Sequence, residues 1–149
     1  MKLLKQDENQ QQFELMDGEA NVLLAILNSY PLTKLKPVKM SKGCLGAEAM
    51  DREFLLNESL KTHRNELKKV AVKLAKENLG RSKEAWLLTL NPDHKEILLQ
   101  ILNDVRTGIW KEMGEPGDIH LKPDSPRKQQ QWTIMNLAGY FEEYLVSLT

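Results

Sequence analysis

The chain has little of what metal-dependent or disulfide-stabilised proteins require. Its 149 residues include one cysteine, Cys44, which excludes an internal disulfide framework. The three histidines, His63, His94 and His120, form no pair at the i,i+3 or i,i+4 spacing that places two ligands on one helix face. We therefore predict no metal site and no cofactor.

Long apolar segments are also missing. No apolar run approaches the roughly 20 residues of a membrane span, and Lys2-Leu3-Leu4 is too short for the core of a signal peptide. We expect a cytoplasmic protein that does not associate with membranes. At 149 residues, the chain is most simply one globular domain, residues 1–149.

Recognisable catalytic and nucleotide-binding motifs are absent as well. Gly43 and Gly46 match neither of the glycine-rich patterns that cradle phosphates. Cys44 is the one candidate thiol nucleophile, but no histidine stands at an interpretable spacing from it. We predict no catalytic residue. An enzyme of unknown class, built on Cys44 or on carboxylates that folding assembles, is an alternative.

Charge is abundant, balanced and unevenly distributed. The chain carries 21 basic and 21 acidic residues. Residues 31–81 contain twelve Lys and Arg against six acids, so the remainder carries the opposite excess. Segregated charge steers a charged partner, whereas a dedicated nucleic-acid binder is usually basic throughout. This pattern favours a protein partner or self-association.

The basic residues predict where a partner would bind. Residues 31–46 read as a basic loop with almost no acids, and Lys61, Arg64 and Lys68 share one helix face behind it. A sequence-independent nucleic-acid-binding surface and a merely solvated face are the alternatives, and aromatic residues that stack on bases are missing from this patch. The predicted partner-binding residues are Lys34, Lys36, Lys39, Lys42, Arg64 and Lys68.

A strand, a helix cap and an apolar helix follow one another twice, in residues 13–27 and 86–102. Asp17 and Asn91 are the predicted caps, because their side chains can accept from the free N–H groups of the first helical turn. Residues 2–5 and 12–16 alternate and predict a hairpin. We expect the strand at 86–90 to join it, since an isolated hairpin is marginal in water.

Four or five helices are predicted around one core. They cover residues 18–28, 92–113 and 125–148, and a stretch at 47–78 that is either one long bent helix or two helices separated near residues 57–62. Gly80 supplies a stop after this stretch. The predicted fold class is α+β, mainly α, with a small N-terminal antiparallel sheet of two to three strands packed with four to five helices.

Polar residues interrupt the apolar stripe of the penultimate helix. Asp104 and Arg106 are two apart and do not face one another on a helix, so each needs a partner elsewhere. We predict that Asn103, Asp104 and Arg106 form a structural polar anchor for the last helix.

Three stretches, residues 13–27, 99–110 and 132–148, resemble an uncharacterised family of small bacterial proteins. It is a domain of unknown function best known from actinobacteria, and its gene tends to lie near that of the Clp protease adaptor. Leu102, Asn103, Asp104 and Arg106 match residues typical of its penultimate helix. The resemblance implies a regulatory or adaptor role. We therefore expect a non-enzymatic interaction or regulatory protein that docks a partner through its charge-segregated surface.

Overall fold

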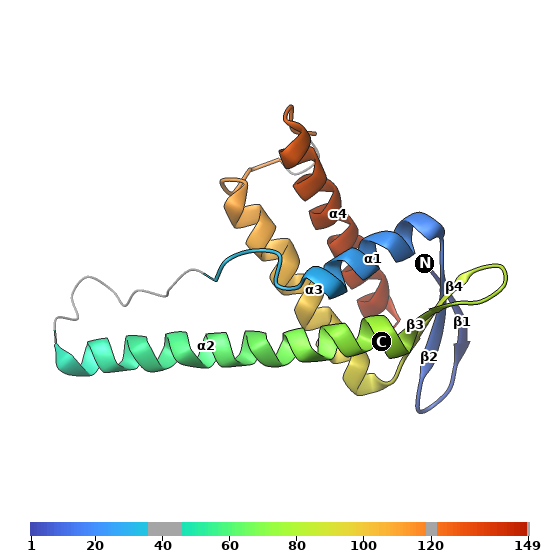
Figure 1. Ribbon diagram of the computed structural model, residues 1–149, viewed down its shortest axis with the longest axis horizontal. Helices are drawn as coiled ribbons and strands as arrows, with labels where there is room; N and C mark the ends of the chain where they lie inside the picture. Colours follow the sequence, from blue (N-terminus) through green and yellow to red (C-terminus); the bar gives the residue numbers. More distant parts are fainter. Residues whose placement is uncertain (36–45, 119–121, 149) are drawn as a thin grey trace.

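The computed structural model describes residues 1–35, 46–118 and 122–148. It confirms an α+β fold that is mainly helical (Figure 1). Four helices pack beside one antiparallel sheet, and a π-helical turn extends the second helix. In chain order the elements are β1 (Lys2–Gln6), β2 (Gln11–Leu15), α1 (Asp17–Ser29), α2 (Ala47–Lys73), η1 (Leu74–Asn78), β3 (Leu79–Arg81), β4 (Trp86–Leu90), α3 (Pro92–Glu112) and α4 (Pro126–Ser147).

The sheet contains the expected hairpin and the expected third strand. Its order is β1-β2-β4-β3, and β2 pairs with β4 in a register that places Gln11 opposite Leu90. A fourth strand, β3, pairs with β4 and was not expected from the sequence. Its three residues are too few to show alternation, and Gly80, expected to end a helix, lies inside it. The helical stretch ends at Asn78, as expected, and Leu79 is buried in the core.

Of the two caps predicted from the sequence, Asn91 has the expected form, and Ser125 caps α4 in the same way. The Asn91 side chain accepts from the His94 N–H at 2.7 Å, and the Ser125 hydroxyl accepts from the Lys128 N–H at 3.2 Å. The first helix differs, because α1 begins at Asp17 and its N-cap residue is Met16. Glu19 accepts from the Met16 N–H at 2.9 Å, so an acid inside the helix satisfies this donor.

Residues 47–73 form one helix, which decides between one helix and two. The chain passes through residues 57–62 without a break, since no glycine or proline interrupts it there. Two contacts within the helix lie in this stretch. Lys61 Nζ is 3.6 Å from Glu58 Oε1, and the Thr62 hydroxyl donates to the Glu58 carbonyl at 2.9 Å. Its first half projects beyond the rest of the molecule (Figure 1).

The core lies between the sheet and the helices. Helices α3 and α4 form an antiparallel pair, and α1 packs against α4 and α2 (Figure 1). Buried apolar side chains of β2, β4, α1, α3, α4 and the C-terminal part of α2 form one cluster, because each element turns its apolar face inward. The largest contributors among the fully buried side chains include Phe13, Tyr30, Leu88, Ile101 and Phe141.

Candidate functional site

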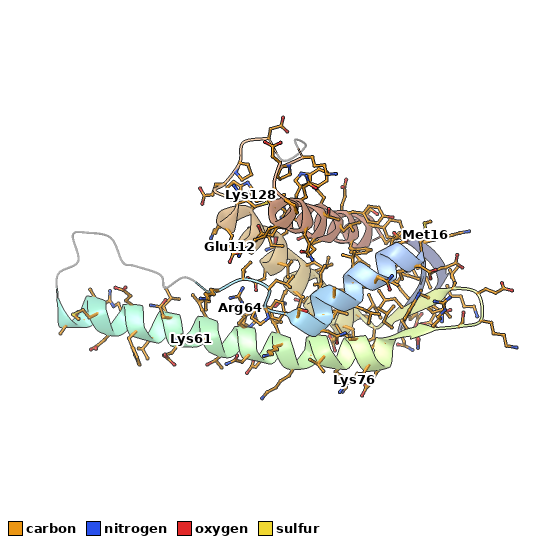
Figure 2. All side chains as sticks on the ribbon, turned by 45° about the horizontal axis from the view of Figure 1, so that its top comes forward. Met16, Lys61, Arg64, Lys76, Glu112 and Lys128 are labelled. Atoms are coloured by element: carbon orange, nitrogen blue, oxygen red, sulfur yellow. The ribbon has the colours of Figure 1, made fainter. Side chains whose placement is uncertain are left out.

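A cleft opens where four segments that are distant in the sequence meet. Residues 31–35, the middle of α2, the end of α3 and the start of α4 surround a volume of about 810 Å³. Figure 2 shows Lys61 and Arg64 on α2 on one side of this space and Glu112 on the other. We call it the basic cleft. Its lining residues are Pro31, Leu32, Thr33, Lys34, Leu35, Lys61, Arg64, Asn65, Glu112, Arg127 and Gln131.

Arg64 forms the inner wall of the basic cleft and is only 9% exposed. Its Nε donates to Asp104 Oδ2 at 3.1 Å, and its Nη2 donates to Thr33 Oγ1 at 3.1 Å. The guanidinium carbon also lies 5.9 Å from the centre of the Tyr30 ring, within reach of a cation–π contact. We call these four residues the Arg64 cluster. They tie α2 and α3 to the segment that follows α1 and begins with its C-cap residue, Tyr30.

Asp104 is the centre of this cluster. Besides the bond from Arg64, its Oδ2 accepts from the Tyr30 hydroxyl at 2.6 Å. Burial raises the pKa of the Tyr30 hydroxyl well above its usual range, and the Asp104 carboxylate raises it further while Arg64 opposes it. Tyr30 therefore stays protonated and donates to Asp104 throughout the neutral range. The partners that Asp104 requires are therefore Arg64 on α2 and Tyr30 at the end of α1.

Gly108 makes room for the Arg64 cluster. A Cβ atom at this position would lie 2.3 Å from Thr33 Oγ1 and 3.3 Å from Thr33 Cβ. The absence of a side chain lets residues 31–35 pack directly on α3, which brings the Thr33 hydroxyl to Arg64. A glycine in the middle of a helix costs helix propensity, and here close packing explains it.

The outer rim of the basic cleft carries an excess of positive charge. Lys34, Lys61 and Arg127 are exposed, and they come from three separate segments. Among the lining residues that the structure describes, the only acid is Glu112, which accepts from Gln131 Nε2 at 3.3 Å. Because the Arg64 charge is balanced by Asp104, the net positive field at the mouth comes from the three rim residues.

The structure brings together some of the residues predicted from the sequence and separates others. Lys34 and Arg64 both line the basic cleft, whereas Lys68 is exposed on α2 and is not among its lining residues. Lys36, Lys39 and Lys42 lie outside the described residues, as does Cys44. The helical spacing of the sequence places Lys61 on the same face as Arg64, whereas no local pattern indicates Arg127.

Asn103, Asp104 and Arg106 divide between two environments. Asp104 is half-buried in the Arg64 cluster, while Asn103 and Arg106 are exposed. Arg106 donates from Nε to Glu142 Oε2 and from Nη2 to Asn103 Oδ1, both at 3.0 Å. The ion pair between Arg106 and Glu142 links α3 to α4 beside a groove of about 850 Å³. The charged lining residues of this groove are Arg106, Glu142 and Glu143, so it lacks the net positive character of the basic cleft.

Neither a metal centre nor a membrane span is found in the part of the chain that the structure describes. Residues 1–35, 46–118 and 122–148 contain no group of three or more His, Cys, Asp or Glu side chains that could hold a metal ion. His94 instead lies with Nδ1 3.2 Å from Asn78 Nδ2. None of the described helices is both long enough and apolar enough to cross a membrane.

Comparison with known proteins gives no family to this fold. No family model, curated protein or solved structure matches the chain. The fold defines an α+β protein with a mainly helical body, and the basic cleft is the feature from which its function can be inferred.

Proposed function

We propose that this protein is a non-enzymatic interaction protein that binds an acidic segment of a partner protein in the basic cleft. One observation carries the proposal. Lys34, Lys61 and Arg127, which are far apart in the sequence, surround a single opening whose inner wall is fixed by Arg64. Placing three exposed cations around one concave surface concentrates positive potential, which attracts and orients an anionic ligand.

The lining favours an acidic polypeptide over a nucleic acid. Pro31, Leu32 and Leu35 give the cleft apolar surface beside the cations, which suits a segment containing both acidic and aliphatic side chains. The described part of the lining contains no aromatic residue on which bases could stack. Glu112 also faces the opening and would repel a continuous phosphate backbone.

The proposed role accords with the adaptor or regulatory role that the family resemblance implies. The Arg64 cluster would hold the cleft in its shape before a partner arrives, which reduces the entropic cost of binding. The rim residues would then supply long-range attraction and the aliphatic residues local contact.

Fluorescence anisotropy with a labelled peptide tests the proposal. The probe is a peptide rich in Asp and Glu with interspersed Leu, and its control replaces every acid by the corresponding amide. We expect the acidic peptide to bind and the amide peptide to bind at least tenfold more weakly, with an affinity for the acidic peptide that falls as salt rises.

Matched charge reversals on one helix locate the binding surface. Lys61→Glu lies in the basic cleft, whereas Lys68→Glu makes the same change on an exposed part of α2 outside it. We expect Lys61→Glu to weaken acidic-peptide binding about tenfold or more, and Lys68→Glu to weaken it far less. Equal effects of both variants would contradict binding in the cleft.

The same assay with single-stranded and duplex DNA tests the alternative of sequence-independent nucleic-acid binding. That alternative predicts tight binding at low salt and a linear fall of log affinity with log salt concentration. DNA binding of this kind, together with no binding of the acidic peptide, would replace the proposed function.

A further inference from the structure

Arg64 keeps one donor group of its guanidinium unbound. Two of the three guanidinium nitrogens are engaged, since Nε donates to Asp104 and Nη2 donates to Thr33. The third, Nη1, has no hydrogen-bond partner among the described residues. In that part of the chain, Trp86 Nε1 is the one fully buried side-chain nitrogen or oxygen without a partner. Nη1 is therefore not sealed inside the protein, and its N–H groups are accessible from the basic cleft that Arg64 lines.

The bound edge of the guanidinium sets the direction of Nη1. Arg64 and Thr33 both line the basic cleft. Asp104 and Tyr30, which also contact the guanidinium, are not among the lining residues and lie on its far side. In a planar guanidinium, Nε and Nη2 share one edge, so bonds along that edge hold the remaining nitrogen at a fixed angle.

The Arg64 side chain is ordered before any ligand arrives. It is buried and held at two nitrogens, so it has already lost most of its rotamer freedom on folding. The Lys61 side chain on the rim is 65% exposed and must be ordered when it binds a ligand. A contact made by Arg64 therefore carries a smaller entropic cost than one made by the rim.

The charge of Arg64 acts at contact rather than at a distance. Asp104 Oδ2 lies 3.1 Å from Arg64 Nε and offsets the field of the guanidinium outside the cleft. An N–H group still donates to an acceptor that reaches it, and a charged acceptor forms a bond about twice as strong as a neutral one. The rim cations Lys34, Lys61 and Arg127 draw such acceptors into the cleft.

We propose that Arg64 Nη1 binds one side-chain carboxylate of the acidic segment and is the specificity-determining contact of the basic cleft. This inference rests on the proposed function, which supplies the acidic ligand, and it divides the work among the cations. One acid of the segment occupies the inner position against Arg64. The other acids face the flexible rim residues, where their exact positions matter less.

NMR of the isotope-labelled full chain tests the contact without any substitution in the protein under test. The probe is a short acidic peptide with both ends blocked, so that only side-chain carboxylates are offered, and its control carries the corresponding amides. We expect the Nη–H signals of Arg64 to move on saturation with the acidic peptide and to stay in place with the amide peptide. Spectra of Arg64→Lys assign these signals.

Arg106 is the internal control for this measurement. Its Nε and Nη2 are bound to Glu142 and Asn103 in the same pattern, but it does not line the basic cleft. Binding of the acidic peptide with unmoved Arg64 signals, or with equal movement of Arg64 and Arg106, would overturn the inference and leave the proposed function standing. No binding of the acidic peptide would overturn both.

A double-mutant cycle tests the specificity. The acids of the peptide are replaced one at a time by amides, and we expect one position to weaken binding to the wild-type chain about tenfold and the others less than about threefold. Arg64→Lys keeps the charge but lacks Nη1, so in this variant the same position should matter no more than the others. A purely structural role of Arg64 predicts instead that Arg64→Lys weakens every peptide by one common factor, which would overturn the inference. If Arg64→Lys does not fold, the NMR titration of the wild-type chain decides.

Discussion

The two halves of α2 have similar numbers of apolar residues, but several of these are buried in the second half and exposed in the first. In the second half Leu67 and Ala71 are buried in the core, and η1 continues the same face with buried Leu74. In the first half, Met50, Phe54 and Leu55 are exposed. The difference lies in the neighbouring helices, because α1 and α3 lie beside the second half of α2 and not beside the first (Figure 1). Apolar residues at helical spacing therefore show that a helix needs a partner, and the partner comes from elsewhere.

The largest expected difference between the core and the first half of α2 comes from truncating one phenylalanine in each. Phe141 is 1% exposed and Phe54 is 64% exposed. Phe141→Ala should lower the free energy of unfolding by about 3–5 kcal/mol, because it leaves a cavity in the core. Phe54→Ala should change it by less than about 0.5 kcal/mol. Urea unfolding followed by circular dichroism measures both, and a large effect of Phe54→Ala would show that Phe54 packs against other parts of the protein.

A second comparison uses two cations one turn apart on α2. Arg64→Met removes the charged partner of Asp104, which keeps only the Tyr30 hydroxyl, and leaves Thr33 without the Arg64 donor, so we expect a loss of about 2–3 kcal/mol. Lys61→Met removes a side chain that is 65% exposed and should cost less than about 0.5 kcal/mol. Equal unfolding midpoints for the two variants in urea would show that the Arg64 cluster does not stabilise the body.

Two helical glycines of the body should respond to alanine with opposite signs. Gly108→Ala forces the new methyl group against Thr33 and should destabilise the fold by about 1–2 kcal/mol. Gly139→Ala meets only Arg106 Cδ, at 3.4 Å, and should stabilise it by up to about 1 kcal/mol through helix propensity. Thermal unfolding of the two variants provides the measurement. Stabilisation by Gly108→Ala would contradict the close approach of residues 31–35 to α3.

The smallest expected effect is a pH dependence confined to the body. The pKa of Tyr30 is raised in the folded state, so its contribution to stability is complete below the unfolded value of about 10 and is lost as pH rises above it. The free energy of unfolding should fall by at most about 1.4 kcal/mol per pH unit from this residue. Tyr30→Phe should remove that part of the decline. An unchanged alkaline decline in the Phe variant would assign it to other groups.

Much of the local structure could be predicted from the residues themselves. Asn91 caps α3, α4 begins at Pro126, and β2 pairs with β4, because caps and strand alternation depend on near neighbours in the chain. Prediction from the sequence was less accurate where the position of a cap or of a short strand depends on tertiary contacts. Met16 rather than Asp17 stands at the N-cap of α1, and Leu79 with its two neighbours forms a strand because β4 offers an edge.

The candidate site was partly visible in the sequence. Lys34 and Arg64 are both among the predicted partner-binding residues and both line the cleft, but the sequence does not distinguish their roles. Arg64 is buried and hydrogen-bonded in the wall of the cleft, whereas Lys34 is exposed at its rim. Arg127 stands 63 residues beyond Arg64 in the sequence, and no periodicity connects positions so far apart.

By itself, the sequence determined the fold class, most helix and strand positions and the segregation of charge, since propensity, caps and periodicity act between residues a few positions apart. Only the tertiary structure decided which half of α2 is covered, that Asp104 would bind Arg64 and Tyr30, and that Lys34, Lys61 and Arg127 would surround one cleft. These outcomes depend on which elements pack side by side. That packing is set by the burial of the whole core rather than by any one segment.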